Sequence, residues 1–142
     1  MQPGRRIAFD YGDVRIGVAL SDRDSILAAP LTTLPNSGSS LITQIGQLIA
    51  EYEPVALYVG EPLNLSGTSS ASAEKTLAFA DKLRTEFKLP VIMIDERLST
   101  VSAASLLRKN GINAKDARSK IDMQAAVAIL EQAIALEKAS DV

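Results

Sequence analysis

Two short apolar segments of the chain each follow a stretch with helical spacing. The segments are VALYVG, residues 55–60, and LPVIMI, residues 89–94. Apolar and small side chains recur at helical spacing within residues 41–52, before the first segment, and within residues 71–87, before the second. Strands joined by a helix pair in parallel and are covered on both faces. The sequence therefore predicts two buried parallel strands in an α/β fold.

The first part of the chain has a different periodicity. Residues 5–11 and 14–21 show period-two patterning around a short turn, which predicts a β-hairpin. Residues 26–35 predict a third strand, with Pro30 at an edge or irregular position. Three meandering strands followed by two helix-separated ones predict a mixed five-stranded sheet with helices on both faces. This order of elements resembles the ribonuclease H-like fold.

Two more helices are expected after the last strand. The first is short, residues 100–109, and ends at an Asn-Gly pair. A polar basic loop follows it, and the last helix is expected from near Ser119 to about Lys138. No linker is long enough to divide the chain, so residues 1–142 are expected to form a single domain. Because no apolar stretch reaches the ~18 residues of a membrane span, a cytoplasmic protein is expected.

The residue types that the chain lacks limit its chemistry. It contains no Cys and no His. Disulfides, thiolate metal sites, a Ser-His-Asp triad and nearly every zinc or copper site are therefore excluded. Catalysis has to come from carboxylates, Lys and Arg, hydroxyls or bound cations. A metal ion would be held by oxygen ligands, which favours Mg²⁺ or Mn²⁺.

An acid interrupts the first predicted strand. Asp10 falls on the strand face opposite to Ile7 and Phe9 and would be partly buried between sheet and helix. A carboxylate there needs a metal ion, an Arg or backbone donors. Gly12 and Gly17 would let a ligand approach both strands of the hairpin closely. An equally weighted alternative is that Asp10 only caps the turn that follows it.

A pair of acids ends the last predicted strand. Asp95 and Glu96 stand at its carboxyl end, the edge of an open α/β sheet where ligands bind. Adjacent strand residues point to opposite faces, so one of the pair would face a shared site. Glu96 is preferred because its longer side chain can reach back over the strand end. The alternative is an acidic start to the next helix.

Two further acids are candidates. Asp122 shares a helical face with Ala125, Ala126 and Ile129, so it could stand at the top of a buried face and point at the strand ends. The segment SKID also matches a capping box, with Asp122 merely closing the start of the last helix. Glu61 ends the first apolar segment; an exposed loop carboxylate is the favoured alternative there.

The acids together predict more than each does alone. Asp10, Glu96 and Asp122 converging at one sheet edge would hold one or two divalent cations. Two ions about 3.5–4 Å apart can activate water and stabilise the leaving oxygen in phosphodiester hydrolysis. Residues 97–120 carry six basic side chains and one acidic one, a net charge of +5 within a chain of net charge −2. This segment predicts polyanion binding, with a solvated surface as an equal alternative.

Five segments, in order and with the expected spacing, resemble a known family. They are FDYGDVRIGVALSD (9–22), APLTTL (29–34), YVGEPLNLSGT (58–68), DERLSTVSAASLLRKNG (95–111) and IDMQAAVAILE (121–131). The resemblance is to the YqgF or RuvX proteins and covers about residues 5–135. These are bacterial ribonuclease H-like nucleases, described as Holliday junction resolvases and as nucleases that process pre-16S ribosomal RNA.

The resemblance implies roles for individual residues. The family's catalytic carboxylates match Asp10, Glu96 and Asp122. The candidates for substrate contacts are Arg15, which matches the first block, and three bases of the basic segment that we add, Arg97, Arg118 and Lys120. The chain departs from the family at Glu61, because the usual block VGLP reads VGEP. Related enzymes often carry an acid there, so Glu61 is either an additional metal ligand or, slightly favoured, a neutral change.

The implied function is a Mg²⁺- or Mn²⁺-dependent nuclease acting on structured nucleic acid. Processing of the 5′ end of pre-16S rRNA, within a pre-ribosomal particle, is favoured over cleavage of branched DNA by a Holliday junction resolvase. A distant alternative is a non-catalytic nucleic-acid-binding assembly factor. The low aromatic content argues against a base-stacking platform. An actin-like ATPase, which shares the D-x-G-x-x-R-x-G pattern, would need a second domain.

Overall fold

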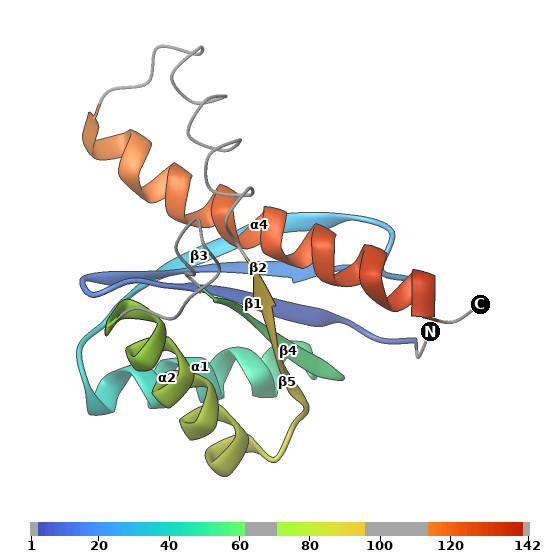
Figure 1. Cartoon of the computed structure of the whole chain (residues 1–142), viewed down its shortest axis with the longest axis horizontal. Coiled ribbons are helices and arrows are strands. Elements are labelled where there is room, and N and C mark those ends of the chain that lie inside the picture. Colours follow the sequence, from blue (N-terminus) through green and yellow to red (C-terminus); the bar gives the residue numbers. More distant parts are fainter. Residues whose placement is uncertain (1–2, 62–70, 96–113, 141–142) are drawn as a thin grey trace.

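A five-stranded mixed sheet forms the centre of the molecule (Figure 1). The computed structural model describes residues 3–61, 71–95 and 114–140, and for 71–72, 114–120 and 140 it describes the helical backbone only. The strands are β1 (Arg6–Tyr11), β2 (Arg15–Ser21), β3 (Ala28–Pro35), β4 (Ala56–Glu61) and β5 (Val91–Asp95). Their order is β3-β2-β1-β4-β5; β1 pairs antiparallel with β2 and parallel with β4, which pairs parallel with β5. The predicted mixed sheet is confirmed.

Three described helices cover the two faces of this sheet. They are α1 (Ser39–Tyr52), α2 (Ala71–Phe87) and α4 (Ala114–Ser140). Helices α1 and α2 lie on one face and α4 lies across the other (Figure 1). None of the helices in the described ranges is both long and apolar enough to cross a bilayer. The helix expected at 100–109 lies outside the described residues.

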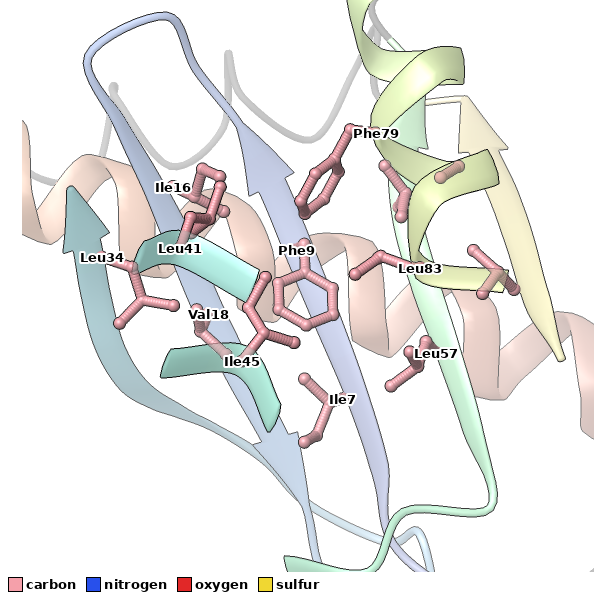
Figure 2. Packing of buried hydrophobic residues seen from close by; sticks show 13 residues of the cluster. Ile7, Phe9, Ile16, Val18, Leu34, Leu41, Ile45, Leu57, Phe79 and Leu83 are labelled. Carbon is pink, nitrogen blue, oxygen red and sulfur yellow. The ribbon is translucent and has the colours of Figure 1, made fainter. Parts of the chain in front are cut away.

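The two faces of β1 pack against different kinds of core. Ile7 and Phe9 belong to a cluster of large side chains beneath α1 and α2, where the rings of Phe9 and Phe79 meet edge to face at 5.8 Å (Figure 2). Ala8, on the other face, packs with Ala126 and Ala133 of α4. Small side chains on both sides let α4 lie close to the sheet. Strand alternation thus decides which helix each residue of β1 contacts.

The edge strand β3 contains the predicted irregularity. Its register with β2 shifts between Val18 and Ala19, which pair with Thr32 and Pro30. Because Pro has no N–H to donate to the ladder, it is tolerated at such a bulge or at a sheet edge, and Pro30 has both. The strand begins at Ala28, two residues later than predicted.

The start of the last helix differs from the prediction. Helix α4 begins at Ala114 and not near Ser119, and its N-terminal end (orange) rises away from the sheet (Figure 1). Residues 114–118 read as a basic loop because they are polar, but Ala, Lys and Arg are also strong helix formers. Ser119 therefore lies inside the helix. An N-cap has non-helical backbone angles, so the capping-box interpretation of Asp122 is wrong.

Candidate metal and nucleic-acid site

Asp10 lies inside β1 and not in the turn after it. It pairs with Gly17 of β2, and the next residue, Tyr11, still pairs with Ile16. Ala8 packs against α4, so alternation along β1 puts Asp10 on the same face of the sheet. The carboxylate is partly buried, as predicted for a strand covered by helices.

Helix α4 brings Asp122 to the same corner of the sheet. A Cβ atom on Gly17 would overlap the main-chain carbonyl of Asp122, so the helix backbone rests directly on β2 at this glycine. We expected Gly17 to make room for a ligand; the room is taken by α4 instead. Gly17 is the cross-strand partner of Asp10, and neighbouring strands are about 4.8 Å apart. The main chain of Asp122, which contacts Gly17, therefore lies one strand away from Asp10. Asp10 and the main chain of Asp122 thus lie at the same corner of the sheet.

Arg15 pairs with one of these carboxylates. Its Nε donates a hydrogen bond to Oδ2 of Asp122, and the two groups form an ion pair. Arg15 is the first residue of β2 and shares the α4 face with Gly17. The side chains of Arg15 and Asp122 remain 32% and 23% exposed, so both are accessible to a ligand. The residues are 107 positions apart, and no local pattern predicts their pairing.

Glu61 ends β4, next to β1, as predicted, but it lies on the other face of the sheet. It pairs in register with Asp95, the last residue of β5. Leu57 and Val59 belong to the cluster under α1 and α2, and alternation puts Glu61 with them. The described geometry therefore separates Glu61 from Asp10 and Asp122 by the thickness of the sheet.

The remaining predicted residues are outside what the structure describes in full. Glu96 and Arg97 fall in the range 96–113, and Arg118 and Lys120 lie on the part of α4 whose side chains are not described. Within the described side chains, no three His, Cys, Asp or Glu residues form a metal-binding group. The two carboxylates at the corner are hard oxygen donors, the type that Mg²⁺ and Mn²⁺ prefer. The donor set is thus chemically suitable for such a cation.

Sequence comparisons assign the chain to a family. The model of the RuvX family, described as "Holliday junction resolvase", matches residues 4–136. A relative in Streptomyces avermitilis is 44% identical over 142 residues, which cover 99% of this chain and 91% of the relative. One in Rhodococcus opacus is 46% identical over 134 residues, covering 90% and 75%. Both relatives are named "Putative pre-16S rRNA nuclease".

Structural comparisons agree on the fold. Thermus thermophilus RuvC in complex with a Holliday junction substrate has a TM-score of 0.62 at 15% identity, covering 95% of this chain and 96% of that one. The yeast mitochondrial Holliday junction resolvase Ydc2 has a TM-score of 0.51 at 13% identity, covering 93% and 78%. These likenesses support the predicted ribonuclease H-like fold. By the match over most of its length, the chain belongs to the RuvX family.

Proposed function

We propose that this protein is a divalent-metal-dependent nuclease that hydrolyses phosphodiester bonds in structured nucleic acid. The observation that supports the proposal is the placement of Asp10 and the main chain of Asp122 at one corner of the α4 face of the sheet, at the carboxyl end of β1. The names of the relatives favour the 5′ end of pre-16S rRNA as the substrate. The enzyme would then act in the cytoplasm, on a pre-ribosomal particle, as a single domain spanning residues 1–142.

The proposed roles follow from the chemistry of the side chains. Asp10, Asp122 and Glu96 would hold Mg²⁺ or Mn²⁺. Glu96 is included because Ile94 of β5 packs against α4. Glu96 is two positions further along the sequence, the spacing of residues on one face of a strand. A cation bound there would polarise the scissile phosphate and activate a water molecule. Glu61 is the least favoured ligand, since alternation puts it on the other face.

The basic residues would bind the substrate backbone. Arg15 is already within hydrogen-bond reach of Asp122, so its guanidinium is placed to contact a phosphate held at the same corner. The basic segment supplies Arg97, Arg118 and Lys120, which would contact further phosphates of the nucleic-acid backbone. Their contribution would be largely independent of base sequence, because phosphate contacts position the substrate without reading it.

Cleavage of Holliday junctions is the second candidate function. The description of the family model favours it. Fold and metal chemistry are common to both activities, so substrates have to be compared directly. The purified protein should be incubated with a pre-16S rRNA fragment and with a four-way DNA junction, in Mg²⁺, in Mn²⁺ and in EDTA. Cleavage of the RNA alone supports the first function, and cleavage of the junction alone supports the second. Metal-dependent cleavage of neither would refute the nuclease proposal and favour a non-catalytic assembly factor.

The site assignment is tested by Asp10→Asn. We expect the rate of cleavage to fall at least about 100-fold, the usual size of effect when a charge-stabilising group is removed from an active site. Asp24→Asn is the matched control, because it makes the same change at an exposed Asp in the turn between β2 and β3, away from Asp10, Arg15 and Asp122. It should cleave like the wild type. Undiminished cleavage by Asp10→Asn would refute the site.

A further inference from the structure

A pocket lies on the sheet face opposite Asp10 and Asp122. A cavity of about 410 Å³ opens between α1 and α2, and we call it the Tyr11 pocket. Ligand pockets usually measure about 300–1,000 Å³, so the size suits a small organic group. Its walls come from the end of β1, the first turn of α1 and one side of α2.

The charges around this pocket are complementary to an anion. Lys75 and Lys82 of α2 both line it, and a spacing of seven residues puts them on one side of the helix. No Asp or Glu is among the described residues that line it. Lys75 pairs with Asp13 at 3.3 Å, and both side chains are exposed. An exposed pair of this kind contributes little, so a phosphate can take the place of Asp13.

Helix α1 adds donors to the same wall. Gly38, its N-cap, has no side chain to accept a hydrogen bond, and the first turn contains no acid. The amide groups that begin a helix attract anions when no side chain caps them. Gly38 and Ser39 both line the pocket, so these amides and the two lysines surround one space.

The floor of the pocket is aromatic and apolar. Tyr11 and Phe79 line it and lie with ring centroids 4.9 Å apart. Figure 2 shows Phe79 at the end of the large-residue cluster, beyond Phe9. The chain has only three Tyr and three Phe, and this scarcity argued against base stacking. The tertiary structure nevertheless collects two of these six at one pocket, with Tyr11 half-buried and thus partly accessible.

We propose that the Tyr11 pocket binds one nucleotide of a single-stranded segment of nucleic acid. The phosphate would lie against Lys75, Lys82 and the first turn of α1, and the base would pack on Tyr11. The link to catalysis rests on the proposed nuclease function: Tyr11 directly follows Asp10, and adjacent strand residues face opposite sides. A nucleic-acid strand that passes over the carboxyl end of β1 would therefore contact both the carboxylates and this pocket.

Binding without cleavage tests the proposal. The affinity of the full chain for fluorescein-labelled oligouridylate is measured by fluorescence anisotropy in EDTA. Lys82→Glu and Ala78→Glu each place a carboxylate at the pocket wall, and we expect affinity to fall at least about tenfold. For Lys82→Ala, the plot of log affinity against log salt concentration should become less steep by about 0.7, the value for one phosphate contact on single-stranded nucleic acid.

A matched control lies at the other end of the molecule. Lys138 is exposed near the C-terminal end of α4. The residue before it, Glu137, contacts Arg6 at the start of β1, whereas Tyr11 lies at the opposite end of that strand. Lys138→Glu makes the same charge change and should alter the affinity less than about twofold. Thermal melts of all variants verify that they are folded. Wild-type affinity in both pocket variants, or an equal loss in the control, would overturn the pocket.

A fluorescent reporter tests the base contact. The chain has no Trp, so Tyr11→Trp creates a single tryptophan at the pocket floor, which can be excited at wavelengths that the remaining tyrosines do not absorb. Its emission should be quenched on addition of oligouridylate and by far less on addition of inorganic phosphate at equal phosphate concentration. Equal quenching by an oligo-aspartate peptide would show a general anion or peptide site and overturn the nucleotide assignment.

The two proposals can fail separately. The anisotropy measurements contain no divalent metal and require no cleavage. Loss of nuclease activity in every substrate test, with intact pocket binding, would refute the nuclease alone. Metal-dependent cleavage combined with unchanged binding in Lys82→Glu and Ala78→Glu would refute the pocket alone.

Discussion

Helix α4 carries two acids, Glu137 and Asp122, that each pair with an arginine of the sheet, and the two pairs differ in the burial of the arginine and in the number of hydrogen bonds between the partners. Near its C-terminal end, Glu137 accepts two hydrogen bonds from Arg6, from Nε at 3.0 Å and Nη2 at 2.9 Å. The Arg6 side chain is only 2% exposed, and its Nη1 also donates to the carbonyl of Gly4 and to Oγ of Ser25, at 2.9 Å each. In the N-terminal half of the helix, Asp122 accepts a hydrogen bond from Nε of the much more exposed Arg15.

This difference separates holding the helix in place from doing chemistry. A bidentate pair whose arginine also donates from its remaining nitrogen to two further acceptors fixes geometry, and removing one partner leaves a buried charge. A half-exposed single contact costs little to break, so its groups can be exchanged for a ligand. We infer that the Arg6 end anchors α4 on the sheet, whereas the Arg15 end leaves Asp122 accessible. At that end, the close backbone contact with Gly17 keeps the helix in position.

The largest effect on stability is expected at the anchoring pair. Glu137→Ala leaves the Arg6 guanidinium buried without its carboxylate and the two hydrogen bonds to it, so the free energy of unfolding should fall by about 3 kcal/mol. Urea unfolding followed by circular dichroism measures this. Glu131→Ala is the control, since Glu131 is exposed on the same helix, and it should change stability by less than about 0.5 kcal/mol. Equal effects of the two substitutions would contradict the anchoring role.

A smaller loss is expected at the backbone contact. In Gly17→Ala the new methyl group would overlap the Asp122 carbonyl, so α4 has to shift, at a cost of about 1–3 kcal/mol. Cleavage should fall as well, because Asp122 moves with the helix. Gly46→Ala provides the comparison: a Cβ there meets the flexible end of the Phe87 side chain, at 3.4 Å, and Ala is the better helix former. That variant should be at least as stable as the wild type, and a loss like that of Gly17→Ala would contradict the close-contact argument.

The smallest effect on stability is expected at the accessible pair. Arg15→Ala should lower the free energy of unfolding by less than about 1 kcal/mol, yet reduce cleavage at least about tenfold if Arg15 contacts the substrate phosphate. Arg15→Lys should restore little, because an ammonium group lacks the planar fork of donors. Arg23→Ala, in the exposed turn between β2 and β3, controls for loss of a surface charge and should cleave normally. A large loss of stability in Arg15→Ala would remove the distinction between the two ends.

Local periodicity was enough to predict the sheet and the position of Asp10 within it. The alternation of Ile7, Ala8, Phe9 and Asp10 is a property of four adjacent residues, and strand geometry converts it directly into two faces. The order of strands and helices then restricted the topology, because connections are short and a helix between strands makes them parallel. The five family blocks added the catalytic roles expected of Asp10, Glu96 and Asp122.

Features that depend on distant residues could not be read in this way. The S-x-x-D pattern around Asp122 misled because a capping box requires the helix to start there, and the residues before it continue the helix instead. The partners Arg15 and Asp122 are 107 residues apart, and Arg6 and Glu137 are 131 apart. Packing of α4 on Gly17 and the assembly of the Tyr11 pocket likewise join separate elements. The sequence encodes each element's preferred faces locally, whereas only the folded chain determines which side chains of different elements meet.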